Sequence, residues 1–495
     1  MGSKPYDRDT EATQVSNAID EELRIEREAR KKRSAREVKV MLLGQAESGK
    51  STLQKQMQLF YASQSLDREK PSWKPIVYFN ILKALRMILG ELDIQYPAIT
   101  QSPSSTPGSP ASPEIPPSTA SSVGNVFSFT HNSVTHSSNS SHYSHPAEAS
   151  WFPELQYLRS KVLPLVASED ALASELSGGI TVTGGRSGVY VRAGWQALVT
   201  SNRAWPLPDI RGSASRPTAV TNIVAKTLLA TQHEIIDLWR HPAVRNLIRS
   251  NKLYLEESAA FFLDSIYRIT EPEYVPSIDD VLHVRVQTLG VTEHQFDVTI
   301  GGLQYHWLLY DVGGAPGVFL TATGLGPVLR RRYITFTFDF LGGRQLTDFD
   351  HLFIATAIIF LAPISAFDQY LEEDPRTNRI DDSLQLFQTL CTNKLLSKAA
   401  LILMLNKTDL LKQKLHAGIK VRKYISSYGD RPNNYEEVSE YFRAHFIQVQ
   451  KRKDSSNRSL YVHFTSMLDV KATQAIITNV GEGIMRQHLS SIGLA

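Results

Sequence analysis

The feature that most constrains this chain is a glycine-bounded loop from Gly44 to Thr52, with the sequence Gly-Gln-Ala-Glu-Ser-Gly-Lys-Ser-Thr. The apolar residues 38–43 before it predict a buried strand, and residues 53–59 after it predict a helix. Strand, loop and helix in this order are typical of a phosphate-binding P-loop; an ordinary glycine turn before a helix is the alternative. The glycines let successive N–H groups point at phosphate oxygens, and the helix presents its positive end to the same anion.

The side chains of this loop fit the same chemistry. Lys50 is expected to reach the β- and γ-phosphates of a nucleotide, and the Ser51 hydroxyl is expected to bind Mg²⁺. The nucleotide-binding residues predicted from the loop are Glu47, Ser48, Gly49, Lys50, Ser51 and Thr52.

Length and composition limit the class of protein. With 495 residues the chain is too long for one typical core, so two or more domains are expected. The net charge of +3 gives no case for nucleic-acid binding. The single cysteine, Cys391, leaves no disulfide framework and fits a reducing compartment. No secretory signal is visible in the polar N-terminus, and the apolar stretch 352–361 is too short to span a bilayer.

The first half of the chain is predicted to be mostly helical. Residues 16–37 predict an exposed helix, whose basic run Arg30–Arg33 is either a solvated face or a membrane or partner contact. Residues 97–150 are rich in Ser and Pro and are expected to be disordered, because they have few large apolar side chains to bury. Residues 178–205 predict a hairpin or a partner loop. Further helices are predicted over 72–94, 155–176, 221–238 and 256–267.

The second half has the pattern of a doubly wound parallel sheet. Gly301-Gly302 lies between two strand-like runs and predicts a hairpin. The predicted strands 356–361, 400–405 and 460–464 alternate with the predicted helices 380–391, 435–450 and 471–488. The predicted fold is therefore an α/β domain into which a mostly helical block has been inserted.

Three further motifs follow predicted strands or the helical block. In Asn406-Lys407-Thr408-Asp409, the carboxylate can accept two N–H bonds from the guanine edge, which adenine cannot offer, while Asn406 and Lys407 brace the loop and cover the base. Asp311 is expected to hold Mg²⁺ through water, and the amide of Gly314 is expected to bind the γ-phosphate. Thr288 can complete the Mg²⁺ coordination, and Arg285 can neutralise charge on the transferring phosphoryl group. Strand-end turns and solvated loop residues are the alternatives.

These motifs and their order resemble heterotrimeric G-protein alpha subunits, and most closely the divergent fungal alpha-like members, on the run Pro363–Tyr370. The resemblance covers about residues 16–94 and 220–495, and Glu47-Ser48 is the form that the P-loop takes in this family. It implies a P-loop GTPase domain with an inserted all-helical domain. Through segments similar to the cleft-facing helix, the first switch and the guanine loop, it adds to the nucleotide-binding residues Ser258, Leu282 and Met467.

The resemblance also implies a division of the chain. The expected parts are a charged N-terminal helix at 1–37, a GTPase domain at 38–66 and 283–495, and a helical domain at 67–282 that contains the insert 97–150. An atypical insertion at 315–345 replaces the second switch. This insertion is either a lineage feature that binds a partner or translated intron, and the transcript sequence distinguishes the two.

Several residues depart from the family pattern. Ala315 stands where the family has the glutamine that orients the attacking water, and Ala46 stands where it has a glycine. Met467-Leu468 replaces Ala-Thr in the guanine loop, and the lipid-accepting cysteine near the start is absent. The missing glutamine predicts slow hydrolysis.

The expected function is a guanine-nucleotide switch that binds GTP or GDP with Mg²⁺ and couples a receptor to effectors. Arg285 is the expected catalytic residue, and the expected metal-binding residues are Ser51, Thr288 and Asp311. The resemblance implies as partners a beta-gamma dimer and a seven-helix receptor, the latter through the C-terminal tail, and a cytoplasmic location with peripheral contact at the inner face of the plasma membrane. Two alternatives remain: a nucleotide-locked or nucleotide-free pseudo-GTPase acting as a scaffold, and an ATP-using P-loop enzyme, against which Asp409 argues.

Overall fold

The described part of the chain contains a six-stranded sheet with a block of helices beside it. The computed structural model describes residues 24, 36–99, 151–177, 190–191, 218–250, 252–288, 291–300, 302–312, 355–371, 374–393, 396–454 and 458–491. The strands are β1 (Glu37–Leu43), β2 (Tyr190–Val191), β3 (Gln287–Thr288), β4 (Val291–Ile300), β5 (Leu303–Val312), β6 (Ala357–Pro363), β7 (Ala400–Asn406) and β8 (Leu460–Phe464).

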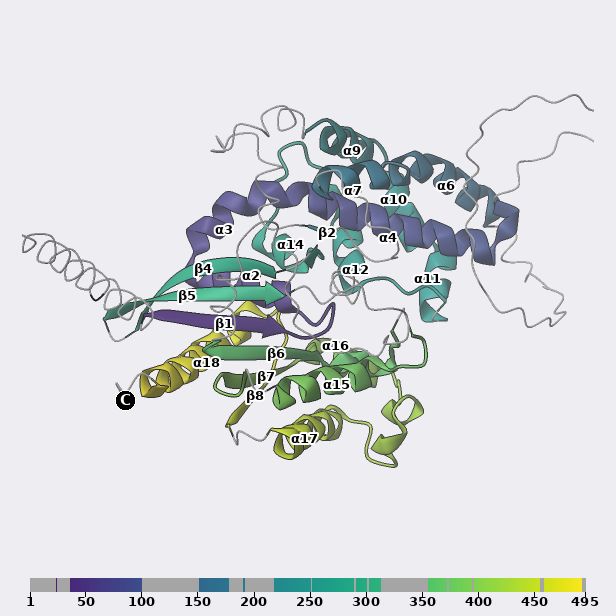
Figure 1. Ribbon diagram of the computed structural model, residues 1–495. Helices are drawn as coiled ribbons and strands as arrows, with labels where there is room; N and C mark the ends of the chain where they lie inside the picture. Colours follow the sequence, from purple (N-terminus) through teal and green to yellow (C-terminus); the bar gives the residue numbers. More distant parts are fainter. Residues whose placement is uncertain are drawn as a thin grey trace, which may run out of the picture.

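The large sheet has the order β4-β5-β1-β6-β7-β8 (Figure 1). Only β4 runs antiparallel to its neighbour, since it forms a hairpin with β5, and the other pairs are parallel. Strands β6 and β7 are continuous apolar runs buried along their whole length, as expected of central parallel strands that are covered on both faces. The prediction of an α/β fold with a doubly wound sheet is confirmed.

Helices cover both faces of the sheet. Side chains of β6 alternate between the faces, so that Ile359 and Leu361 share a core with α2 and α18, whereas Ile358 and Phe360 share a core with α15 and α17. The helices that accompany the sheet are α2 (Lys50–Tyr61), α15 (Arg379–Thr392), α16 (Thr408–His416), α17 (Tyr435–Lys453) and α18 (Val470–Ser491). Short 3₁₀ turns, η6 (Ile364–Asp368), η8 (Val421–Lys423) and η9 (Ser426–Tyr428), connect these elements.

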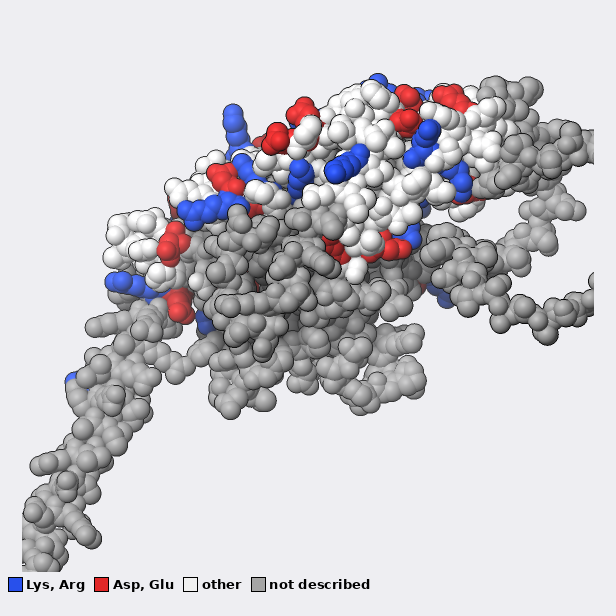
Figure 2. Space-filling model, turned by 90° about the horizontal axis from the view of Figure 1, so that it is seen from above, with Lys and Arg blue, Asp and Glu red and all other residues white. Residues whose placement is uncertain are grey.

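The helical block lies above the sheet in Figure 1 and has a separate core around the long helix α4. Its elements are α3 (Ser63–Glu69), η1 (Lys70–Trp73), α4 (Lys74–Gln95), η2 (Pro97–Ile99), α6 (Phe152–Val166), α7 (Glu169–Ser177), α9 (Thr218–Ala230), α10 (Gln232–Arg240), α11 (Pro242–Arg249), α12 (Glu257–Asp264), α13 (Ile266–Ile269) and α14 (Ile278–His283). Seen from above, the part of the molecule that is coloured carries acidic and basic side chains intermixed (Figure 2). Among the described helices, none is long and apolar enough to cross a membrane.

Three predicted helices are each broken into two. The breaks at Ser168, Thr231 and Ser265 separate α6 from α7, α9 from α10 and α12 from α13. Hydroxyl side chains compete with the helical hydrogen bonds, and Thr231 Oγ1 donates to the Thr227 carbonyl at 2.8 Å. Hydrophobic periodicity continued across these residues and therefore hid the breaks.

Other predictions need correction or fall outside the described residues. Residues 97–99 form an ordered turn because Ile99 is buried in the helical core, whereas 100–150 lie outside the described part. Glu37 belongs to β1 rather than to a helix, and most of the predicted helix 16–37 is not described. Of residues 178–205, the described pair Tyr190–Val191 forms a parallel ladder with β3 rather than a hairpin. The insertion 315–345 is also outside the described residues.

Candidate functional site

The P-loop follows β1 at the centre of the sheet. Gly44 and Gly49 have φ angles of +142° and +101°, in the region that favours glycine. A Cβ atom at Gly44 would overlap the carbonyl of Leu361, and one at Gly49 would overlap the side-chain amide of Asn406. The close approach of the neighbouring strand ends therefore requires both glycines. Glu47, with φ of 65°, completes the tight turn.

Lys50 folds back over the loop. Its Nζ donates to the carbonyl of Gly44 at 2.9 Å and to that of Gln45 at 2.6 Å. Burial lowers the pKa of Lys50 to about 8, although the nearby carboxylate of Asp311 acts in the opposite direction. A buried ammonium group is thus held where the backbone curls around it, which suits an anion arriving at the loop.

The hydroxyl and the carboxylate predicted to hold a metal are adjacent. Ser51 Oγ donates to Asp311 Oδ2 at 2.8 Å, across 260 residues of sequence. They meet because β1 and β5 are neighbouring parallel strands, and Ser51 and Asp311 lie near their carboxyl ends. Oxygen donors of this kind are those that Mg²⁺ prefers. Thr288 lies in β3, and Gly314 is outside the described residues.

Arg285 is held at both its side chain and its backbone. The guanidinium is ion-paired with Glu47 of the P-loop and, at 3.1 Å, with Glu256 at the start of α12. Its N–H donates to Asn80 Oδ1 at 3.0 Å, and its carbonyl accepts from Asn80 Nδ2 at 3.1 Å. The predicted catalytic arginine therefore lies between the P-loop and the helical block.

A second arginine, Arg379, also contacts the P-loop. Arg379 Nη1 donates to Glu47 Oε2 at 3.0 Å, and Nη2 donates to the Ala46 carbonyl at 2.6 Å. Arg379 lies in the stretch 368–383, which resembles the third switch of the family, whereas no motif in the sequence singles out Glu256 or Asn80. The side chain of Asn378 caps α15 and so fixes the backbone next to Arg379.

The predicted base-recognition segment contacts the P-loop directly. Asn406 Nδ2 donates to the Ser48 carbonyl at 2.8 Å, and Asn406 Oδ1 accepts from Thr465 Oγ1 at 3.1 Å. Lys407 has a left-handed conformation with φ of 65°, which turns the chain into α16. Asp409 follows in the first turn of that helix.

The remaining predicted residues border the same region. Met467 is buried, and its carbonyl accepts a bond from Gln56 Nε2 at 2.9 Å. Ser258 is buried at the start of α12, Leu282 is buried in α14, and Thr52 is half-buried on α2. Of the predicted set, the structure thus brings together the P-loop, Arg285, Asp311, Asn406 and Met467.

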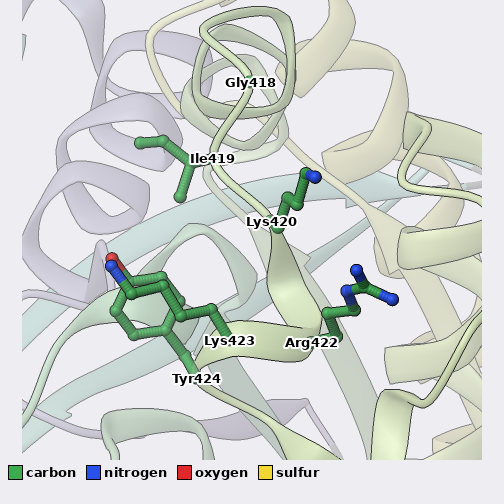
Figure 3. Close-up of a pocket in the computed structure, with 6 residues that line it drawn as sticks. All are labelled: Gly418, Ile419, Lys420, Arg422, Lys423 and Tyr424. Carbon is green, nitrogen blue, oxygen red and sulfur yellow. The ribbon is translucent and has the colours of Figure 1, made fainter.

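A surface cavity of about 540 Å³ lies beyond the far end of α16. It is lined by Gly418, Ile419, Lys420, Arg422, Lys423 and Tyr424 (Figure 3). None of these residues belongs to the motifs above. The cavity is therefore a feature separate from the P-loop.

Comparison with known proteins agrees with this arrangement. A family model for the G-protein alpha subunit matches residues 13–484. The chain is 30% identical to the guanine nucleotide-binding protein alpha-4 subunit of Mycosarcoma maydis, over 93% of this chain and 84% of that protein. It is 27% identical to the alpha-1 subunit of the same organism, over the full length of both. The chain belongs to the family of G-protein alpha subunits, which are guanine-nucleotide-binding signalling proteins and, in general, GTPases.

Proposed function

We propose that this protein binds GTP and GDP together with Mg²⁺, hydrolyses GTP slowly, and acts as a receptor-coupled switch. The observation that carries the proposal is the bond from Asn406 to the Ser48 carbonyl at 2.8 Å. Through it, the segment suited to a guanine base and the loop suited to phosphates form one continuous surface. A scaffold without a nucleotide would have no need for that junction.

The P-loop would hold the phosphates. The amides of Glu47, Ser48 and Gly49 would surround the anion, with Lys50 supplying a positive charge and Thr52 a further donor at the start of α2. Lys50 would exchange its two carbonyl partners for phosphate oxygens. The carbonyl bonds support this role because they keep the ammonium group buried and oriented before the ligand arrives.

The metal would be held by Ser51 directly and by Asp311 through water, with Thr288 completing the set. The bond between Ser51 and Asp311 supports the fit, because it places two oxygen ligands together at the strand ends. When bound, Mg²⁺ neutralises the charge on the β- and γ-phosphates. Gly314 would contribute its amide to the γ-phosphate.

The base would be read by Asp409. Its carboxylate would accept two N–H bonds from guanine, while Asn406, Lys407 and the buried Met467 would shape the pocket. Ser258 and Leu282 would close the cleft from the side of the helical block. An adenine base would leave the carboxylate unpaired, which disfavours ATP.

Hydrolysis would depend on Arg285. An arginine supplied in this way is worth about 10³–10⁵ in rate in GTPases of this type. Ala315 has no group that could orient the attacking water, so the rate is expected to be low. Replacing Ala315 with glutamine should raise it.

The partners are proposed from the family alone. They are a beta-gamma dimer, a seven-helix receptor that binds the C-terminal tail, and an unidentified effector, with the protein at the inner face of the plasma membrane. The proposed division is a GTPase domain of 38–66 and 283–495 around a helical domain of 67–282. The separate cores of sheet and helical block support this division.

The second candidate is a nucleotide-locked or nucleotide-free pseudo-GTPase that acts as a scaffold. Ala315 in place of a water-orienting glutamine is the feature that favours it. The two candidates differ in whether bound GTP is ever hydrolysed.

A single-turnover experiment separates them. Purified protein is loaded with labelled GTP, Mg²⁺ is added, and bound nucleotide and released phosphate are followed together. The switch predicts slow phosphate release that Arg285→Ala slows further and Ala315→Gln accelerates. Stable binding with no release in the wild type supports the locked form, and failure to bind either nucleotide contradicts the switch.

A further inference from the structure

A chain of ion pairs links Arg285 to the interior of the helical block. Arg285 is paired with Glu47 on one side and with Glu256 Oε2 at 3.1 Å on the other. The second oxygen of Glu256, Oε1, is paired with Lys83 of α4. Each oxygen of Glu256 therefore has a different cation, Arg285 for Oε2 and Lys83 of the helical block for Oε1.

These three side chains are largely shielded from water. The exposed fractions of the side chains are 22% for Arg285, 15% for Glu256 and 8% for Lys83. A carboxylate at such a place is stable only while it is paired, because removing one partner leaves a charge that water cannot solvate. The pairing of Glu256 therefore restricts where Arg285 can go.

Helix α4 contacts both Arg285 and its partner Glu256. Asn80 exchanges two hydrogen bonds with the backbone of Arg285, and Lys83, one turn further along α4, contacts Glu256. The residues Asn80, Lys83, Glu256 and Ser258 also line one small pocket. The bonds from Asn80 hold the backbone of Arg285, so a change of partner would take place at its guanidinium.

We propose that Glu256 is a positioning residue that restrains the guanidinium of Arg285, and that Lys83 is the second cation that allows Glu256 to release it. To reach a phosphoryl group, the guanidinium must leave a carboxylate. When it leaves Glu256, Lys83 keeps that carboxylate paired. The helical block would in this way set how readily the arginine engages the nucleotide. The inference rests on the proposed function, because it requires a nucleotide in the cleft.

Opposite effects of two substitutions test this proposal. Glu256→Gln removes the competing charge, so the single-turnover rate of GTP hydrolysis should rise about threefold to tenfold. Lys83→Gln leaves Arg285 as the only cation beside Glu256, so the rate should fall by a similar factor. In the double variant the effect of Lys83→Gln should vanish, since Lys83 acts only through Glu256.

A binding measurement provides a readout that does not depend on turnover. The ratio compares the affinity for a non-hydrolysed GTP analogue with the affinity for GDP. Relative affinity for the analogue should rise in Glu256→Gln and fall in Lys83→Gln. Both shifts should disappear in an Arg285→Ala background. Glu256→Asp keeps the negative charge, so its relative affinity should lie between those of Glu256→Gln and the wild type. This variant tests the proposal even if Glu256→Gln does not fold.

Asp93 supplies a matched control. It is a half-buried carboxylate of α4 in the helical block, and it pairs with Arg159 of α6 at 2.8 Å. Asp93→Asn should change neither the rate nor the ratio. Equal rates and ratios in all variants, or changes of the same sign in Glu256→Gln and Lys83→Gln, overturn the inference alone. Absence of nucleotide binding in the wild type overturns the proposed function as well.

Discussion

The side chain of Asn406 donates a hydrogen bond to the carbonyl of Ser48 at 2.8 Å, although 358 residues separate them in the sequence. Both groups are buried, and a side chain on Gly49 would collide with the same amide. One asparagine therefore connects the end of β7 to the P-loop.

Asn406→Ala should weaken binding of GDP. It leaves the Ser48 carbonyl buried without its donor, which costs about 1–3 kcal/mol of folding stability, and the P-loop is no longer held against the base segment. The dissociation constant for GDP should therefore rise at least about fivefold. Equilibrium binding of labelled GDP measures the effect. Asn434→Ala is the control, because Asn434 caps α17 and should alter the stability of the protein without changing nucleotide affinity.

Asp409→Asn should change the base that is preferred. An amide in place of the carboxylate can accept one bond and donate another, which matches the edge of xanthine better than that of guanine. Affinity for GDP should fall at least about tenfold, while affinity for XDP should rise. Competition between the two diphosphates measures the preference, and an unchanged ratio would show that Asp409 does not contact the base.

Nucleotide affinity should fall as the pH rises above about 8. The pKa of Lys50 in the free protein is lowered to about 8 by burial, whereas a phosphate beside it would favour the protonated form. Above that pH the free protein has lost a proton that the complex keeps, so each complex formed must take up a proton. Measurement of the dissociation constant for GDP at several pH values up to about 9.5 tests this dependence of affinity on pH. Lys50→Arg should bind with a flatter pH dependence, because arginine stays charged.

Two glycine substitutions should have opposite effects on stability. Gly49→Ala introduces a Cβ atom at φ of +101° against the amide of Asn406, so it should destabilise the protein and impair binding. Gly90→Ala places a methyl group in open space within α4 and should stabilise the protein by about 1 kcal/mol. Chemical unfolding measures both changes. Stabilisation by Gly49→Ala would contradict the close packing of the P-loop.

Much of the fold was already predictable from local patterns. The buried strands β6 and β7 are uninterrupted apolar runs, and the hairpin of β4 and β5 turns at a pair of glycines, so hydrophobicity and turn chemistry indicated both. The P-loop and the Asn406 segment were also evident, because phosphate and base recognition need particular residue types at fixed spacing. Helix breaks at Ser168, Thr231 and Ser265 were missed, since periodicity alone does not register one or two residues that leave the helix.

Local sequence patterns were thus enough to predict the family, the sheet, the P-loop and the residue types suited to a guanine nucleotide. Which charged side chains meet follows from the folded arrangement of the chain. Arg285 pairs with Glu47 and Glu256, Lys83 pairs with the same Glu256, and Arg379 reaches the P-loop across 332 residues. Ion pairs of this kind have no signature in local sequence, because each partner is an ordinary charged residue until chain folding and burial bring the two together and remove the competing water.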